Sequence, residues 1–316
     1  MDANATLLER TRAALWGVAV GDAFGKMTEG YWPNQVDLRY GGHLEEFRMP
    51  IPASPDRVGY WSLAEVTDDT TFTVLTAESI IENERVDEKD LAARIAAKPI
   101  KGWPGWEQFD PQQALSGANT RTGNGAPMRA SPFGIINPTE RLGELCRDVY
   151  AGCRGTHNSQ SAIGAACAMA ACLSAVLEGM EKVSALKVAS QAARMGEKLG
   201  VEDYLPHLSR RIEWILNVYV PTGNAKRGGL NPGFTACEGA TYALYLFAKH
   251  DSAKEGIIDA ANQGGDADSI ASMTACLLAA YRPETLPGEW IDIVRQKNSI
   301  DMDALTERLT KLRFRR

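Results

Sequence analysis

Apolar residues recur every three or four positions along most of the chain, which is the spacing of one face of an α-helix. The first such run extends from Leu7 to Gly21 and predicts an opening helix. The same spacing predicts helices within residues 72–81, 91–97, 142–149, 162–177, 186–199, 208–218, 240–248, 257–261, 270–281, 291–294 and 305–312. Strand-like alternation is scarce, and residues 36–38 are too few to indicate a sheet. We therefore predict an all-α fold of about ten or more helices.

Three long breaks in this pattern, at residues 25–66, 99–136 and 221–233, contain many of the Gly and Pro residues. Breaks longer than about 12–15 residues in a compact domain are usually functional or disordered. Disordered segments seldom carry tryptophan, whereas these contain Trp32, Trp61, Trp103 and Trp106. Two interpretations stay open: the tryptophans line a binding site, or they cap the core. No repeat or change of composition divides the chain, so we expect one domain over residues 1–316.

Composition excludes several classes of protein. The 316 residues carry 34 Lys and Arg against 40 Asp and Glu, a net charge of -6, which argues against a nucleic-acid binder. Six cysteines form no CxxC pair and four histidines no i, i+4 pair, so neither a disulfide scaffold nor a zinc site is expected. The start of the chain lacks a targeting pattern, and the apolar stretch 165–176 is too short for a membrane span. These features predict a cytoplasmic protein outside the membrane.

Two acidic segments directly precede predicted helices. Residues 67–70 read Thr-Asp-Asp-Thr before the helix at 72–81, and residues 264–269 read Gly-Gly-Asp-Ala-Asp-Ser before the helix at 270–281. Capping a helix needs one such side chain or two. Each segment alone is an ordinary helix start, but together they supply four carboxylates with neighbouring hydroxyls.

Those oxygens form the ligand set that hard divalent cations prefer. If the two helix starts converge, repulsion among the carboxylates raises their pKa values unless a cation neutralises them. Two Mg²⁺ ions would suit four acids better than one, and Mn²⁺ would also satisfy them. The spacing does not match an EF-hand, whose ligands lie on one continuous loop.

Five segments of the chain together resemble the ADP-ribosylglycohydrolase family. Residues 17–25 followed by Glu29 are similar to its GxxxGDAxG…E motif, and residues 67–70 match its TDDT. Residues 123–129 followed by Pro132 resemble its GNGxxMRxxP, residues 156–159 its TH segment, and residues 264–269 its GGDTDT. The motifs occur in the order found in that family and cover roughly residues 10–282.

The resemblance implies an all-α fold with a two-magnesium site between helix starts. It implies metal ligation by six residues, in which Ser269 stands where the family usually has Thr: Thr67, Asp68, Asp69, Asp266, Asp268 and Ser269. It also implies that Glu29 acts near the scissile bond, that Asn124 and Gly125 line the substrate site, and that His157 belongs to the pocket.

The expected reaction is metal-dependent hydrolysis of a ribosyl glycosidic bond, removing ADP-ribose from a modified protein side chain or small acceptor. In this hypothesis Glu29 orients or deprotonates the water, while four aspartates hold the ions: Asp68, Asp69, Asp266 and Asp268. Trp32, Trp103 or Trp106 would stack on a base of the substrate. Two alternatives stay open, an N-ribosidase acting on a free nucleoside or nucleotide and a non-catalytic, crystallin-like relative. The oligomeric state is not predicted.

Overall fold

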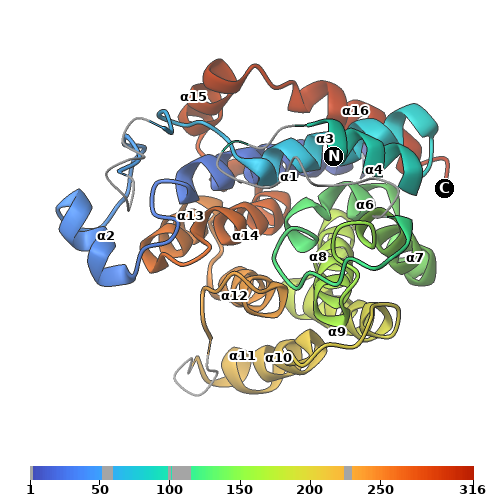
Figure 1. The fold of residues 1–316 in the computed structure, drawn as a ribbon. Helices are drawn as coiled ribbons and strands as arrows, with labels where there is room; N and C mark the ends of the chain where they lie inside the picture. The colour runs from blue at the N-terminus through green and yellow to red at the C-terminus, as the bar shows by residue number, and fades with distance from the viewer. Residues whose placement is uncertain (1–2, 52–59, 99–100, 102–114, 224–229) are drawn as a thin grey trace.

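The computed structural model describes residues 3–51, 60–98, 101, 115–223 and 230–316. Helices dominate these residues, and they contain no strand, although two isolated β-bridges join Gly123 to Thr235 and Ser159 to Val201. Figure 1 shows their arrangement. The α-helices are α1 (Ala3–Gly25), α2 (Pro33–Tyr40), α3 (Asp68–Asn83), α4 (Glu88–Ala97), α6 (Ser131–Ile136), α7 (Leu142–Cys153), α8 (Gln160–Leu177), α9 (Lys182–Glu197), α10 (Leu208–Trp214), α11 (Val220–Thr222), α12 (Ala236–Lys249), α13 (Ala253–Gln263), α14 (Ala267–Tyr281), α15 (Gly288–Asn298) and α16 (Met302–Arg313).

The prediction of an all-α fold is confirmed, and each predicted run overlaps a helix. Among the described residues, the helices α2 and α6 lie wholly where breaks were predicted, and α11 overlaps the start of a third break. Helix α2 presents only Val36 and Tyr40 as buried residues, which is too little apolar surface to give a readable period. Helix α6 is buried on every side and therefore has no polar face to mark its period. Residues 215–219 form a π-helix, so the run predicted at 208–218 is not one regular α-helix.

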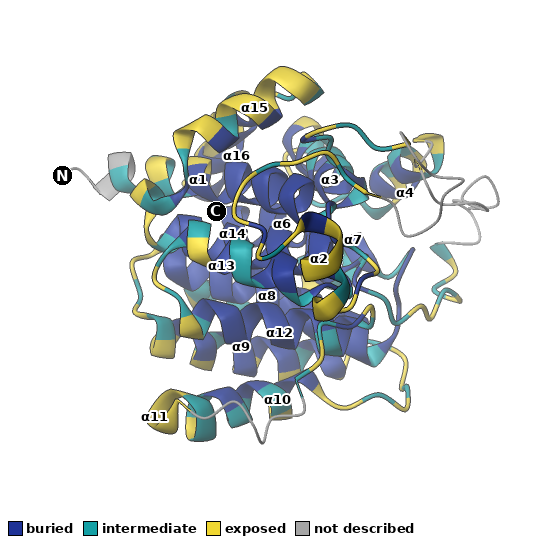
Figure 2. Cartoon of the chain, turned by 90° about the vertical axis from the view of Figure 1, so that its left-hand side faces the viewer, coloured by how far each residue is buried: buried dark blue, intermediate teal, exposed yellow. Residues whose placement is uncertain are grey.

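Helix α8 lies at the centre of the core, and buried helices surround it in Figure 2. The helix spans 18 residues with a mean hydropathy of 1.7, so by length and composition it could cross a membrane. The prediction that this stretch is too short was therefore wrong, because the helix extends beyond 165–176 at both ends. Its window is 94% buried inside the protein, which is typical of the core helix of a globular domain.

Helices α1 and α14 lie side by side (Figure 1). A Cβ atom added at Gly17, Gly21 or Gly25 would lie 2.6, 2.3 or 2.2 Å from a carbonyl oxygen of α14. The three carbonyls belong, in that order, to Ala275, Ala271 and Ala267. As residue numbers rise along α1 they fall along α14, so the helices are antiparallel. The end of α1 therefore meets the start of α14.

We expect Gly21→Ala to reduce the free energy of unfolding by about 1–3 kcal/mol, because the new methyl group forces apart two backbones in contact. The matched control is Gly288→Ala, where the Cβ meets no atom within 4 Å. Urea unfolding of both variants measures the difference. Equal stabilities would show that the contact between α1 and α14 tolerates a side chain.

Candidate functional site

Asp22, in the last turn of α1, holds the start of α3. Its carboxylate accepts hydrogen bonds from the backbone N–H groups of Thr67, at 2.9 Å, and Thr70, at 3.0 Å. It also accepts from the hydroxyl of Thr67, at 2.8 Å, and from that of Thr70, at 2.5 Å. Thr67 is the N-cap of α3, and its hydroxyl oxygen accepts from the N–H of Asp69. The first turn of α3, with its own two acids, is thereby fixed against α1.

Carboxylates from three helices and the loop after α1 meet at this point. One oxygen from each of Asp22, Asp69 and Asp268 lies within 4.8 Å of the others. A second group of the same kind joins Glu29, Asp266 and the same Asp268. We call these the Asp22 triad and the Glu29 triad. The early and late acidic segments therefore converge, as the sequence predicted.

Burial and mutual repulsion raise the pKa values of these acids. Burial, with the charge of Asp268 added, raises the pKa of Asp22 to about 6 even though four donors stabilise its charge. The same two causes raise the pKa of Glu29 to about 7 and that of Asp68 to about 7. Asp69 and Asp266 have pKa values well above the ordinary carboxyl value, first through burial and then through neighbouring carboxylates.

This donor set fits a divalent cation. Every ligand atom is an oxygen, which suits Mg²⁺ or Mn²⁺. In addition, Oδ1 of Asp69 is buried with no hydrogen-bond partner. An unpartnered buried oxygen of a charged group is costly, and a cation would satisfy it. The two triads are therefore candidate cation positions that share Asp268.

The remaining predicted ligands lie around the triads. The hydroxyl of Ser269 donates to Oδ2 of Asp69 at 3.4 Å, and that of Thr67 lies 3.3 Å from the same oxygen. Asp68 belongs to neither triad and is partly exposed, although the charge of Asp268 acts on it. Thr67, Ser269 and Asp68 thus lie at the site, and their ligation of an ion stays a prediction.

Lys26 lies among these acids, and the sequence analysis assigned it no role. Its ammonium donates to Glu29 and lies 3.4 Å from Oδ2 of Asp268. The ammonium also lies over the ring of Trp61, 4.5 Å from the centroid. Burial opposes the charge of Lys26, but Asp268 and Glu29 outweigh it and raise its pKa. Lys26 is therefore a fixed positive charge at the Glu29 triad.

Asn124 connects the loop before α6 to the acids. Its side-chain NH₂ donates to Oδ2 of Asp266 and to the carbonyl oxygen of Gly233, the latter at 3.1 Å. The carbonyl oxygen of its side chain is buried without a partner. Asn124 therefore orients one acid of the Glu29 triad and keeps an acceptor available to a ligand.

Gly125 and His157 lie in contact on the same side of the site. A Cβ at Gly125 would lie 2.4 Å from the imidazole ring, so only glycine fits there. Burial, followed by the charges of Arg129 and Arg121, lowers the pKa of His157 to about 3, and the ring is neutral at physiological pH.

The tautomer of His157 follows from Thr156. The hydroxyl of Thr156 donates to the carbonyl oxygen of Cys153 and accepts from Arg129. It therefore accepts a further hydrogen bond from Nδ1 of His157, 2.9 Å away. Protonation at Nδ1 leaves Nε2 of the neutral ring as an acceptor.

The tryptophans predicted to line a site have different surroundings. Trp61 packs against Lys26 at the edge of the acids. The side chain of Trp32 is exposed, with a relative exposure of 68%, although its backbone lies beside Gly264. Trp103 and Trp106 lie outside the described residues. A stacking role for Trp32 stays a prediction.

The sequence predicts neither Asp22 nor Lys26 as a site residue. Asp22 lies within the motif at residues 17–25, to which no ligand was assigned, and Lys26 directly follows that motif. The signal for Asp22 was an acid within an otherwise apolar helical run, since a carboxylate there needs partners. No comparable signal existed for Lys26, because a lysine just after a helix is normally solvated.

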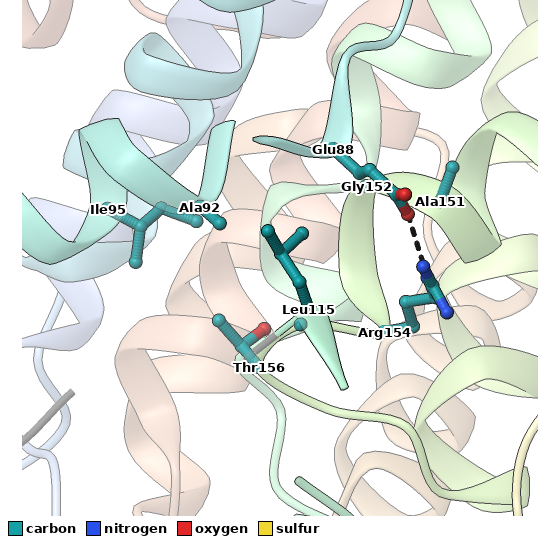
Figure 3. Close-up of a pocket in the computed structure, with 9 residues that line it drawn as sticks. Glu88, Ala92, Ile95, Leu115, Ala151, Gly152, Arg154 and Thr156 are labelled. Atoms are coloured by element: carbon teal, nitrogen blue, oxygen red, sulfur yellow. Dashed lines mark hydrogen bonds and ion pairs between the residues drawn. The ribbon is translucent and has the colours of Figure 1, made fainter. Parts of the chain in front are cut away.

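A separate small cavity lies between α4 and α7 (Figure 3). Its rim carries the ion pair of Arg154 with Glu88, at 2.8 Å, and its wall includes Thr156. It has room for about one water molecule. The cavity is too small for a ribosyl group and adds no second site.

The chain is similar to several known proteins over most of its length. The chain is 25% identical over 302 residues to the uncharacterized protein YegU of Escherichia coli, covering 86% of this chain and 87% of YegU. It is 24% identical over 326 residues to ADP-ribosylhydrolase ARH3 of Bos taurus, covering 90% of this chain and 88% of that protein. Among solved structures, an ADP-ribosylglycohydrolase-related protein complex superposes with a TM-score of 0.73 at 24% identity, covering 97% of this chain and 99% of the other.

That structural likeness shows a shared fold. The family model for ADP-ribosylglycohydrolase matches residues 3–316, which includes all five motif segments and both triads. The chain therefore belongs to the ADP-ribosylglycohydrolase family, whose members are enzymes that hydrolyse glycosidic bonds.

Proposed function

We propose that this protein removes ADP-ribose from a modified protein side chain or a small acceptor, in a hydrolysis that depends on divalent cations. The observation that carries the proposal is the meeting of the Asp22 and Glu29 triads around Asp268. The similarity to a protein named ADP-ribosylhydrolase supports the choice of substrate.

Asp22, Asp69, Asp266 and Asp268 are the residues that would hold the cation, with Mg²⁺ preferred and Mn²⁺ as an alternative. We propose one ion for each triad. When bound, such ions supply Lewis acidity toward sugar hydroxyls and water. Thr67, Asp68 and Ser269 would complete the set of oxygen ligands.

Glu29 is proposed as the residue that orients or deprotonates the attacking water. It is more exposed than the other members of the triads, with 31% of its side chain accessible, so water and substrate can reach it. Burial and Asp268 raise its pKa to about 7, close to the value that suits a general base near neutral pH. The anomeric carbon develops positive charge during cleavage, which nearby carboxylates stabilise.

Asn124, Gly125 and His157 are proposed to bind the substrate. The buried carbonyl oxygen of Asn124 and Nε2 of His157 are both acceptors, so they fit hydroxyl or N–H donors of a ligand. Gly125 keeps the backbone close to the imidazole. Trp32 would add an aromatic surface at the outer edge.

The substrate class is tested with a panel of ADP-ribosylarginine, ADP-ribosylserine and free nucleosides, each incubated with the protein and Mg²⁺. We expect release of ADP-ribose from at least one ADP-ribosyl adduct. Chromatography measures this release. Release of a free base from nucleosides, with neither adduct cleaved, would replace the proposal by an N-ribosidase.

Glu29→Gln should lower kcat by roughly 10²–10⁴-fold, the usual contribution of a general acid or base. The matched control is Glu65→Gln, which removes a carboxylate that pairs with Lys101 outside both triads. Steady-state kinetics on the cleaved adduct compares the two. If both variants keep the parent kcat, Glu29 is not the base.

Divalent cations should stabilise the protein more at pH 8 than at pH 5.5. A raised folded pKa means that these carboxylates favour the folded state at low pH, and that contribution is lost as pH rises from about 4 through the folded values of about 6 to 7. A bound cation replaces those protons above pH 7. At a free cation concentration of one hundred times Kd, we expect the free energy of unfolding to rise by about 2.7 kcal/mol. This corresponds to a rise in Tm of roughly 5 °C.

The measurement is the difference in Tm between Mg²⁺ and EDTA at each pH. His157, whose lowered pKa acts in the opposite direction, contributes equally with and without the ion and cancels in the difference. A gain in Tm that is the same at both pH values would argue against metal ligation by these acids.

A further inference from the structure

The two triads differ in one respect that the acids alone do not show. Among the described residues, no lysine or arginine forms an ion pair with Asp22 or Asp69. The Glu29 triad instead has Lys26, whose ammonium contacts Glu29 and also lies 3.4 Å from Asp268. One end of the site thus contains a positive charge that belongs to the protein itself.

The position of this ammonium is fixed by the chain around it. The backbone N–H of Lys26 donates to the carbonyl oxygen of Asp22 at 2.9 Å, which continues the turn at the end of α1. The side chain is only 12% exposed. The ammonium also lies over the ring of Trp61, 4.5 Å from its centroid. Contacts with this aromatic ring and with two carboxylates restrict the position of the ammonium.

We infer that Lys26 makes the two cation positions unequal: a divalent ion binds tightly at the Asp22 triad, whereas an ion at the Glu29 triad must displace the Lys26 ammonium and binds more weakly. The inference rests on the proposed cation site. Its physical basis is that the ammonium and the second ion compete for the carboxylates of Glu29 and Asp268, of which only Asp268 also belongs to the Asp22 triad. Lys26 is thus a positioning residue that sets how readily the second ion enters.

The simpler interpretation is that Lys26 forms an ordinary structural ion pair with Glu29. In that case its removal would affect stability but would leave the two cation affinities in the same relation. The Asp22 triad provides an internal reference, because it meets Lys26 only through the shared Asp268. Among the described residues, Asp22 and Asp69 form no ion pair with a lysine or arginine.

The test is calorimetric titration of Mn²⁺ into protein stripped with EDTA, comparing the parent with Lys26→Met. We expect two binding events in the parent whose Kd values differ by at least about tenfold. In Lys26→Met the weaker event should tighten by at least about tenfold, with a smaller change in the tighter one. Asp69→Asn should remove the tight event and Asp266→Asn the weak one.

The matched control is Lys101→Met. Lys101 also lies over the ring of Trp61, at 4.6 Å, and pairs with a carboxylate, Glu65, at 2.6 Å, but it contacts neither triad. This variant should keep both parent affinities. Circular dichroism checks folding, and Lys26→Gln provides a second neutral variant if the methionine variant does not fold.

Two outcomes would overturn the inference in different ways. Two equal affinities in the parent, unchanged by Lys26→Met and Lys26→Gln, would remove the role of Lys26 and leave the cation-dependent function standing. Absence of any Mn²⁺ binding by the folded parent would remove the proposed cation site together with the inference.

Discussion

The direct backbone contact between α1 and α14 is the constraint on which the site depends. Gly17, Gly21 and Gly25 place one helix against the carbonyl groups of the other, with no side chain able to fit between them. Because the helices are antiparallel, this contact brings the end of α1 to the start of α14. Asp22 and Asp268 are therefore neighbours although 246 positions separate them, counted from their residue numbers. A looser helix pair would leave the acids too far apart to share an ion.

The second requirement is that the fold tolerates several buried carboxylates. Their pKa values are raised chiefly by burial, so the charged forms are unfavourable where they lie. The protein itself offsets part of the cost of these buried negative charges. Asp69 and Asp268 lie in first helical turns, where the helix dipole favours negative charge, and Asp22 accepts hydrogen bonds from Thr67 and Thr70. The rest of the compensation is the electrostatic basis for expecting a cation.

The sequence predicted the helices well where one face is apolar and the other polar, and it failed where that contrast is absent, as in α2 and α6. It predicted Asp69, Asp266 and Asp268 because adjacent acids at a helix start exceed what capping requires. It did not identify Asp22 or Lys26, since their importance arises only from packing: nothing in the residues around Lys26 indicates that Trp61 covers its ammonium. Side-chain contacts between distant segments cannot be derived from the period of one helix.

The two ends of the site differ in their exposure to solvent. The Asp22 triad is buried throughout, whereas the Glu29 triad is partly accessible through Glu29, and the partly exposed Asp68 lies nearby. Solvent reaches the site at Glu29, and Lys26 and Trp61 lie at this end. The buried end is thus suited to holding an ion permanently, and the accessible end to exchanging water, protons and substrate. In the proposed arrangement the Lys26 ammonium compensates the carboxylates at the accessible end, and it meets the Asp22 triad only through the shared Asp268.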